Sequence, residues 1–190
     1  MTVVCNATPL INFAAINRLD ILETAFCKIV IPQAVYYETT VAGFPGSEFV
    51  LQAIASRWLQ VRSVSIIAPN ILLKLDNGER EAIALALLTG EERILLDQRE
   101  ARQVAQSLGL QVIGTLGVLL LAKNREIITQ VQPLLDAMID TAQYWVNRTL
   151  YQQVLGQAGE LIESAKDVNY STLKIPVKIR SPNPISKYTI

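Results

Sequence analysis

Short runs of β-branched and other apolar residues alternate along this chain with longer stretches in which apolar residues recur every three or four positions. Such alternation predicts an α/β fold, in which helices flank a mainly parallel sheet of about five strands. The predicted strands are the apolar runs at residues 2–5, 28–31, 58–64, 93–97 and 111–113. The predicted helices begin near residues 9 and 32 and, further on, span about 47–57, 76–90, 98–108, 115–123, 126–140 and 147–157.

Polar residues at two of the helix starts predict how the free backbone N–H groups there are satisfied. Thr8 precedes Pro9, so we expect Thr8 to cap a helix that has Pro9 at its first position. Asp76 and Glu79 form the D-x-x-E pattern of a capping box. The helix that follows is apolar almost all round, which predicts that it is buried.

The length and composition of the chain fit one domain with a short appendage. Its 190 residues are 51% hydrophobic and 18% charged, so most of the chain is expected to fold around a core. We place a domain at 1–160 and an extended basic arm at 161–190. Residues 166–190 hold five basic residues against one acidic residue, a balance of +4 in a chain whose formal net charge is zero. The remainder is therefore at −4 and has no gross basic signature.

The cysteine and histidine counts exclude several classes of chemistry. The chain has no histidine, which excludes a histidine general base, a Ser-His-Asp triad and the common zinc sites. Two cysteines are too few for a secreted disulfide scaffold and favour a reducing compartment. No apolar stretch is long enough for a membrane helix, and the N-terminus does not resemble a signal peptide. We therefore expect a cytoplasmic protein that does not interact with membranes.

Polar residues follow the predicted strands at positions where α/β proteins bind ligands. Asn6 ends the first strand and Asp97 ends the strand at 93–97, while Glu38 and Glu79 lie on neighbouring predicted helices. Ligands of open α/β sheets bind outside the carboxyl ends of the strands. Carboxylates gathered there would repel one another unless a cation lay between them. Mg²⁺ or Mn²⁺, which prefers oxygen ligands, is the natural candidate.

Each of these residues also has an ordinary structural interpretation. Asp97 with Glu100 repeats the capping-box pattern and could simply cap the following helix. Glu38 could be a solvated residue at a helix end, and Asn6 an ordinary turn residue. The residues alone therefore leave two hypotheses open, a metal site and a set of helix caps.

Five segments resemble, in order, the motifs of the PIN-like domain family. Asn6–Asn12 (NATPLIN) is similar to the family's opening D-T-S-P-L-I, and residues 31–38 (IPQAVYYE) resemble its second motif, I-P-x-x-V ending at an acid. Residues 78–86 (GEREAIALA) and 95–102 (LLDQREAR) resemble the third and fourth. Residues 114–117 (GTLG) follow as in a poorly characterised branch related to VapC-like ribonucleases of toxin–antitoxin pairs. The resemblance covers about residues 1–160.

The resemblance implies a three-layer PIN-like fold and a Mg²⁺- or Mn²⁺-dependent endoribonuclease, with RNA as substrate, an antitoxin protein as possible partner and a homodimer as the expected assembly. It implies metal-site roles for Asn6, Glu38, Glu79 and Asp97, and the spacing to Asp97 favours Glu79 over Glu81. Further residues could contact RNA: Thr8, through its hydroxyl, and Arg99 and Arg102, on the helix after the last acid. Surface arginines are also common as merely solvated groups.

One position departs from the family pattern. The first motif has an aspartate where this chain has Asn6, which keeps a carbonyl oxygen but removes one negative charge. A weaker metal site follows, so the alternative to a nuclease is a catalytically weakened or inactive PIN-like module that binds RNA or protein. Trp58, Tyr144, Trp145 and the apolar stretch 116–121 could line an oligomer surface or fill the core.

Overall fold

The computed structural model describes residues 2–41, 45–65 and 74–161, in which helices and strands alternate as the hydrophobic pattern predicts. The strands are β1 (Thr2–Cys5), β2 (Lys28–Pro32), β3 (Leu59–Arg62), β4 (Arg93–Leu95) and β5 (Gln111–Ile113). The helices are α1 (Ala7–Ala15), α2 (Leu19–Phe26), α3 (Gln33–Thr40), α4 (Ser47–Ala55), α5 (Asn77–Thr89), α6 (Arg99–Ser107), α7 (Thr115–Asn124), α8 (Gln132–Thr141) and α9 (Arg148–Gln157).

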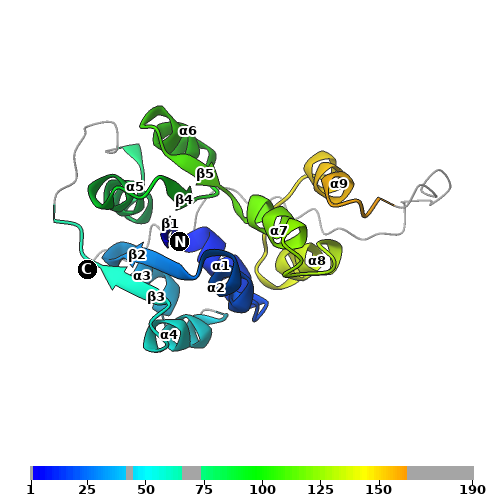
Figure 1. Cartoon of the computed structure of the whole chain (residues 1–190), viewed down its shortest axis with the longest axis horizontal. Helices are drawn as coiled ribbons and strands as arrows, with labels where there is room; N and C mark the ends of the chain where they lie inside the picture. The colour runs from blue at the N-terminus through cyan, green and yellow to red at the C-terminus, as the bar shows by residue number, and fades with distance from the viewer. Residues whose placement is uncertain (1, 42–44, 66–73, 162–190) are drawn as a thin grey trace.

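All pairings in the sheet are parallel, and the strand order is β3-β2-β1-β4-β5 (Figure 1). β1 is therefore the central strand, with Cys5 opposite Leu95 of β4 and Val4 opposite Val30 of β2. The three central strands are buried, whereas β3 at one edge is only partly so. The predicted parallel α/β sheet is thus confirmed, and the carboxyl ends of β1, β2 and β4 meet at one edge.

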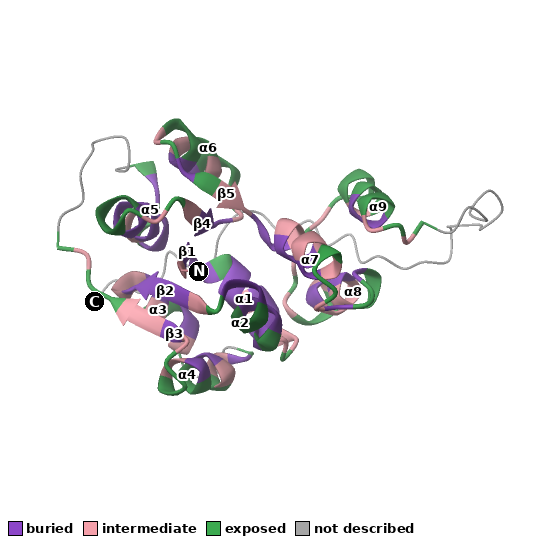
Figure 2. Cartoon of the chain, viewed as in Figure 1, coloured by how far each residue is buried: buried purple, intermediate pink, exposed green. Residues whose placement is uncertain are grey.

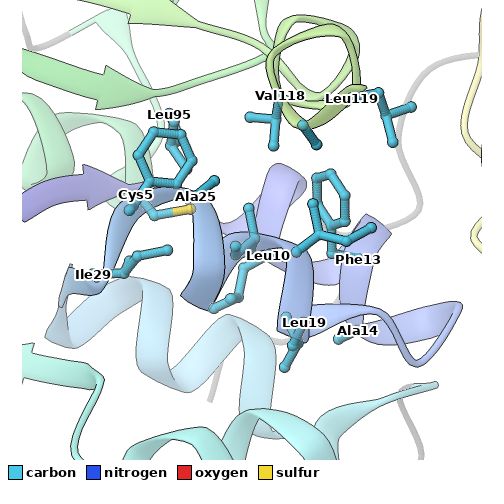
Figure 3. Packing of buried hydrophobic residues seen from close by; sticks show 14 of the residues in the cluster. Cys5, Leu10, Phe13, Ala14, Leu19, Ala25, Ile29, Leu95, Val118 and Leu119 are labelled. Carbon is cyan, nitrogen blue, oxygen red and sulfur yellow. The ribbon is translucent and has the colours of Figure 1, made fainter. Parts of the chain in front are cut away.

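The sheet has a separate hydrophobic core on each face, because successive residues of a strand point to opposite sides. Val3 and Cys5 of β1 face the larger core, which contains side chains of α1, α2, α7, α8 and α9 (Figure 3). Val4, between them, faces the smaller core formed with α5 and α6. Phe13 of α1 is wholly buried in the larger core, and such burial contributes about 1.5–3 kcal/mol.

Two helices connect these layers to the carboxyl edge of the sheet. α5 packs across β1, β2 and β4, and because the parallel strand β4 follows it, α5 must begin at the carboxyl edge. α3 contacts α5, α1 and α4. The first turn of α5 carries Glu79, and α3 carries Glu38.

Several expected details are corrected. α1 begins at Ala7 with Asn6 as its N-cap, so Thr8 lies inside the first turn, exposed, and does not cap the helix. The helix expected at 126–140 begins only at Gln132, and α2 appears where no separate helix was predicted. α5 is mostly buried from Gly78 to Ala86 but ends exposed, with Leu88 59% accessible.

The aromatic residues that could fill the core or line an oligomer surface divide between the two environments. Trp58 and Tyr144 pack against the larger core, whereas Trp145 is 80% exposed. Figure 2 shows β2 mostly buried and α9 largely exposed. Val118 and Leu119 of α7 are buried in that core. No helix in the described part of the chain is long and apolar enough to cross a membrane. The basic arm expected at 161–190 lies outside the described residues apart from Leu161.

Candidate functional site

Asn6 lies at the centre of the carboxyl edge, directly after β1. Its backbone N–H donates a hydrogen bond to the carbonyl oxygen of Leu95 at 2.9 Å, which continues the pairing of β1 with β4. Asn6 is the N-cap of α1, yet its side chain makes no capping hydrogen bond, and Oδ1 is buried without a partner. A buried amide oxygen without a donor is costly, so this atom points to a group that the protein itself does not supply.

Glu79 is buried at the start of α5 and uses only part of its hydrogen-bonding capacity. The expected capping box is present: the Glu79 N–H donates to Asp76 Oδ1 at 2.8 Å, and the Asp76 N–H donates weakly to Glu79 Oε2 at 3.4 Å. Glu79 Oε1 is buried without a hydrogen-bond partner, and the whole residue is only 1% exposed. Burial, followed by the charge of Asp76, raises the pKa of Glu79 to about 7. Capping thus accounts for one oxygen of Glu79 and not for the other.

The neighbouring acid on α5 has a different role. Glu81 Oε2 accepts a hydrogen bond from the backbone N–H of Ala34 at 2.9 Å. Ala34 lies in the first turn of α3, whose N-cap residue, Pro32, provides no side-chain cap. Glu81, on α5, therefore caps the start of α3. Of the two acids, Glu79 is the one with an unpartnered oxygen.

Glu38 approaches the same helix start from α3. A Cβ atom added at Gly78 would lie 2.7 Å from Glu38 Oε1, so only glycine allows this carboxylate to rest against the first turn of α5. Burial raises the pKa of Glu38 to about 7, with further contributions from the charges of Asp76 and Glu81, and a hydrogen bond from the Gly78 backbone opposes the rise. Glu38 and Glu79 thus form an acidic pair at one helix N-terminus.

Asp97 lies on the other side of Asn6, after β4, and caps a helix other than the expected one. α6 has Gln98 as its N-cap and no side-chain cap, so the alternative interpretation, in which Asp97 caps α6 with Glu100, is wrong. Instead, Asp97 Oδ1 accepts from the Thr115 N–H at 2.8 Å and Oδ2 from the Thr115 hydroxyl at 2.5 Å, at the start of α7. Burial raises the pKa of Asp97, while the Thr115 hydrogen bonds and the charge of Arg102 oppose the rise.

Thr115 and Asn12 are site residues that sequence reasoning did not assign. Asn12 Nδ2 donates to the Thr115 hydroxyl oxygen at 3.2 Å, so a buried chain of hydrogen bonds runs from α1 through Thr115 to Asp97. The signal for Thr115 was present, since a threonine follows the glycine that opens the helix after β5. The burial of Asn12 on α1 depends on packing between helices distant in sequence.

The predicted RNA-contacting residues occupy different positions around this site. The Arg102 guanidinium donates to the carbonyl oxygen of Leu96 at 3.2 Å and lies close to Gly114 and Asp97. Arg99 is exposed in the first turn of α6, and Thr8 is exposed in the first turn of α1. Arg102 is therefore held in place by the end of β4, whereas Arg99 is not held by any hydrogen bond that the described part of the chain records.

The arrangement is an edge of the sheet with Glu38 and Glu79 on one side, Asp97 on the other, and the amide of Asn6 between them. β1 lies between β2, which leads to Glu38, and β4, which leads to Asp97. Within residues 2–41, 45–65 and 74–161, no three acidic, cysteine or histidine side chains come close enough together to hold a metal ion. A bound cation would nonetheless provide a partner for the unpartnered oxygens of Asn6 and Glu79, and it would favour the charged form of the carboxyl groups whose pKa values are raised.

Comparison with known proteins assigns the family. The DUF3368 family model, which describes a PIN domain, matches residues 2–160. This match covers most of the chain, and the chain therefore belongs to the PIN-domain family. The expected PIN-like α/β fold and the family resemblance are thereby confirmed.

Two further comparisons add little. A PilT N-terminus domain protein from the hyperthermophilic archaeon Sulfolobus solfataricus is similar in structure, with 19% identity and a TM-score of 0.43 over 78% of this chain and 99% of that chain. No curated protein matches the chain. The family assignment therefore rests on the family model.

Proposed function

We propose that this PIN-domain protein is a metal-dependent endoribonuclease that hydrolyses RNA phosphodiesters at the carboxyl edge of its sheet. The observation that carries the proposal is the pair of buried, unpartnered oxygens, Asn6 Oδ1 and Glu79 Oε1. They accompany carboxyl groups whose pKa values burial raises. Buried acceptors without donors, next to carboxylates that repel one another, are suited to a hard divalent cation.

The residues that would hold Mg²⁺ or Mn²⁺ are Asn6, Glu38, Glu79 and Asp97, with water molecules completing the coordination, because the three acids are not gathered closely enough to hold an ion by themselves. All of their donor atoms are oxygens, as these ions prefer. When bound, such an ion lowers the pKa of a water molecule and neutralises charge that develops on a phosphodiester. The chain lacks histidine, and this chemistry does not require one.

The protein's own groups prepare the site in two ways. Thr115 donates to both oxygens of Asp97 and is itself held by Asn12, so the Asp97 carboxylate is fixed in orientation. Glu38 lies against the first turn of α5, where the backbone of Gly78 hydrogen-bonds it. Fixed side chains need no reorganisation when a substrate binds, which is the main source of catalytic power in polar active sites.

The test is cleavage of a labelled pool of single-stranded RNAs by the full chain with Mn²⁺ or Mg²⁺, and again with EDTA. We expect metal-dependent cleavage that falls about 100-fold or more in Asp97→Asn and in Glu79→Gln. Glu23→Gln, which removes an exposed carboxylate from α2, is the matched control and is expected to cleave normally. Equal cleavage by Asp97→Asn would refute the proposed site.

The second candidate is a PIN-like module that binds RNA or protein without cleaving it, and Asn6 is the observation that favours it. A neutral amide at the centre of the edge attracts a cation less strongly than a carboxylate does. Asn6→Asp decides between the two candidates: new cleavage in the variant, with none in the native protein, would favour the binding module. Cleavage by the native protein would establish that Asn6 serves as a neutral ligand.

Two assembly predictions accompany the proposed nuclease. It could be the ribonuclease of a toxin–antitoxin pair, and it is expected to form a homodimer in the cytoplasm. Light scattering of the purified chain tests the dimer directly. Growth arrest on induced expression, relieved by a co-expressed binding protein and lost in Asp97→Asn, tests the toxin role.

A further inference from the structure

A groove of about 600 Å³ opens beside Asp97 and is lined by residues of α6, β5 and α7. These elements lie next to one another in Figure 1, with β5 between the two helices. One wall is a face of α6, and the other is formed by the start of α7, by Tyr144 in the connection from α8 to α9, and by Leu150 of α9. Its volume is in the range of pockets that hold small organic ligands. The groove therefore has room for a ligand next to one of the proposed metal-binding acids.

The α6 wall is polar and positively charged. Arg99, Arg102, Gln103 and Gln106 line the groove, and their spacing of three and four residues places them on one face of the helix. Arg102 is anchored by the Leu96 carbonyl, whereas the other three side chains are exposed. This wall offers two cations and two amides, and its only acidic neighbour in the groove is Asp97.

The opposite wall offers an aromatic ring and apolar groups. Tyr144 is half-buried and lines the groove together with Leu116 and Leu150. Burial raises the pKa of Tyr144, the charge of Asp97 raises it further, and the charge of Arg102 opposes the rise. Tyr144, Asp97 and Arg102 all line this groove, so the tyrosine shares it with one of the proposed metal-binding acids.

We propose that this groove binds one unpaired nucleotide of an RNA strand next to the phosphodiester that is cleaved. The base would stack on Tyr144, the amides of Gln103 and Gln106 would hydrogen-bond its edge, and Arg99 and Arg102 would contact phosphates. The proposal rests on the proposed function in taking RNA as the ligand. Aromatic stacking, amides and arginines are the groups that bind single-stranded nucleic acid.

The chemistry of the two walls argues for a single strand. A base within a duplex has both faces covered by neighbouring bases and cannot stack on a protein side chain. A ligand that contacted only phosphates would need the arginines and not the ring. The charge is also complementary, because the helix face of this groove presents two arginines to the negatively charged backbone of RNA.

The experiment measures binding without cleavage. Fluorescence anisotropy in EDTA compares a labelled single-stranded 12-nucleotide RNA with the same sequence in a blunt duplex, using the full chain. We expect the single strand to bind about tenfold more tightly. Tyr144→Leu is expected to lose about tenfold, whereas Tyr144→Phe, which keeps the ring, binds within about twofold of the native protein.

Charge and folding controls accompany these variants. Arg99→Gln is compared with Arg57→Gln, because Arg57 is an exposed arginine just before β3, at the opposite edge of the sheet. Only Arg99→Gln is expected to weaken binding. Because Tyr144 packs against the core, circular dichroism melts verify its variants, and the exposed pair Gln103→Ala and Gln106→Ala tests the same groove without core contacts.

The outcomes separate this proposal from the proposed nuclease function. If the native protein cleaves RNA with metal, and the folded variants Tyr144→Leu and Arg99→Gln bind RNA as it does, the groove proposal is overturned and the nuclease proposal stands. RNA binding that weakens in Tyr144→Leu and Arg99→Gln, without any cleavage by the native protein, supports the proposed nucleotide groove and overturns the proposed nuclease function. Equal affinity for duplex and single strand, or loss of a dimer in Tyr144→Leu with unchanged RNA binding, overturns the proposal in favour of a charge-only or self-association surface.

Discussion

The substitution Glu79→Gln tests whether the buried acid on α5 is a source of instability that the protein retains for function. Glutamine is also favoured at the third position of a capping box, so the variant keeps the hydrogen bond with the Asp76 backbone while it removes the charge. The native carboxyl is 1% exposed, and one of its oxygens has no partner. The variant therefore isolates the effect of a buried charge.

The magnitude and sign follow from the pKa. The pKa of Glu79 rises from the usual 4.5 to about 7 in the fold, so the folded state retains a proton that the unfolded chain releases between these values. The native protein therefore loses stability as the pH rises from about 4.5 through about 7, by up to about 3 kcal/mol for this one group. Glu79→Gln lacks this loss, and is expected to be more stable than the native protein at pH 8 but not at pH 4.5.

The assay is urea unfolding at pH 4.5 and pH 8 in EDTA, with Glu23→Gln as control. The difference between Glu79→Gln and the native protein should grow by about 2–3 kcal/mol between the two pH values, while Glu23→Gln follows the native curve. Excess Mn²⁺ at pH 8 should raise the stability of the native protein and not of Glu79→Gln, if Glu79 is a ligand. Parallel curves for Glu79→Gln and native protein would refute the reasoning.

Three further predictions concern the supports of the site. Thr115→Val removes the hydroxyl between Asn12 and Asp97 and should lower the free energy of unfolding by about 1–3 kcal/mol, measured by urea, and lower the cleavage rate of folded protein; an unchanged midpoint would contradict this. Gly78→Ala would place a methyl group 2.7 Å from Glu38 Oε1, so we expect weaker Mn²⁺ binding by calorimetry, with Gly156→Ala in α9 as a control whose Cβ would meet only the flexible side chain of Leu161. Phe13→Ala should cost about 3–5 kcal/mol without changing the pH dependence, because Phe13 fills the larger core.

The sequence by itself determined the layers of this protein. The five predicted strands and the parallel α/β class are confirmed because each strand is a local, strongly apolar run, and burial on both faces demands such runs. The sequence also predicted the capping box at the start of α5, the acid on α3 and the family, since each depends on residues a few positions apart. α2 and the late start of α8 were missed because short amphipathic helices gain their stability from packing more than from their own sequence.

Only the tertiary structure decided what each polar group at the sheet edge does. Asp97 hydrogen-bonds Thr115, eighteen residues away, in preference to the adjacent helix, because β4 and β5 end side by side. Glu81 caps α3 across a gap of 47 residues, which leaves Glu79 with an unpartnered oxygen. A carboxylate at a strand end is equally suited to a helix start or a cation, and the three-dimensional positions of the surrounding N–H and O–H donors determine which role remains for it.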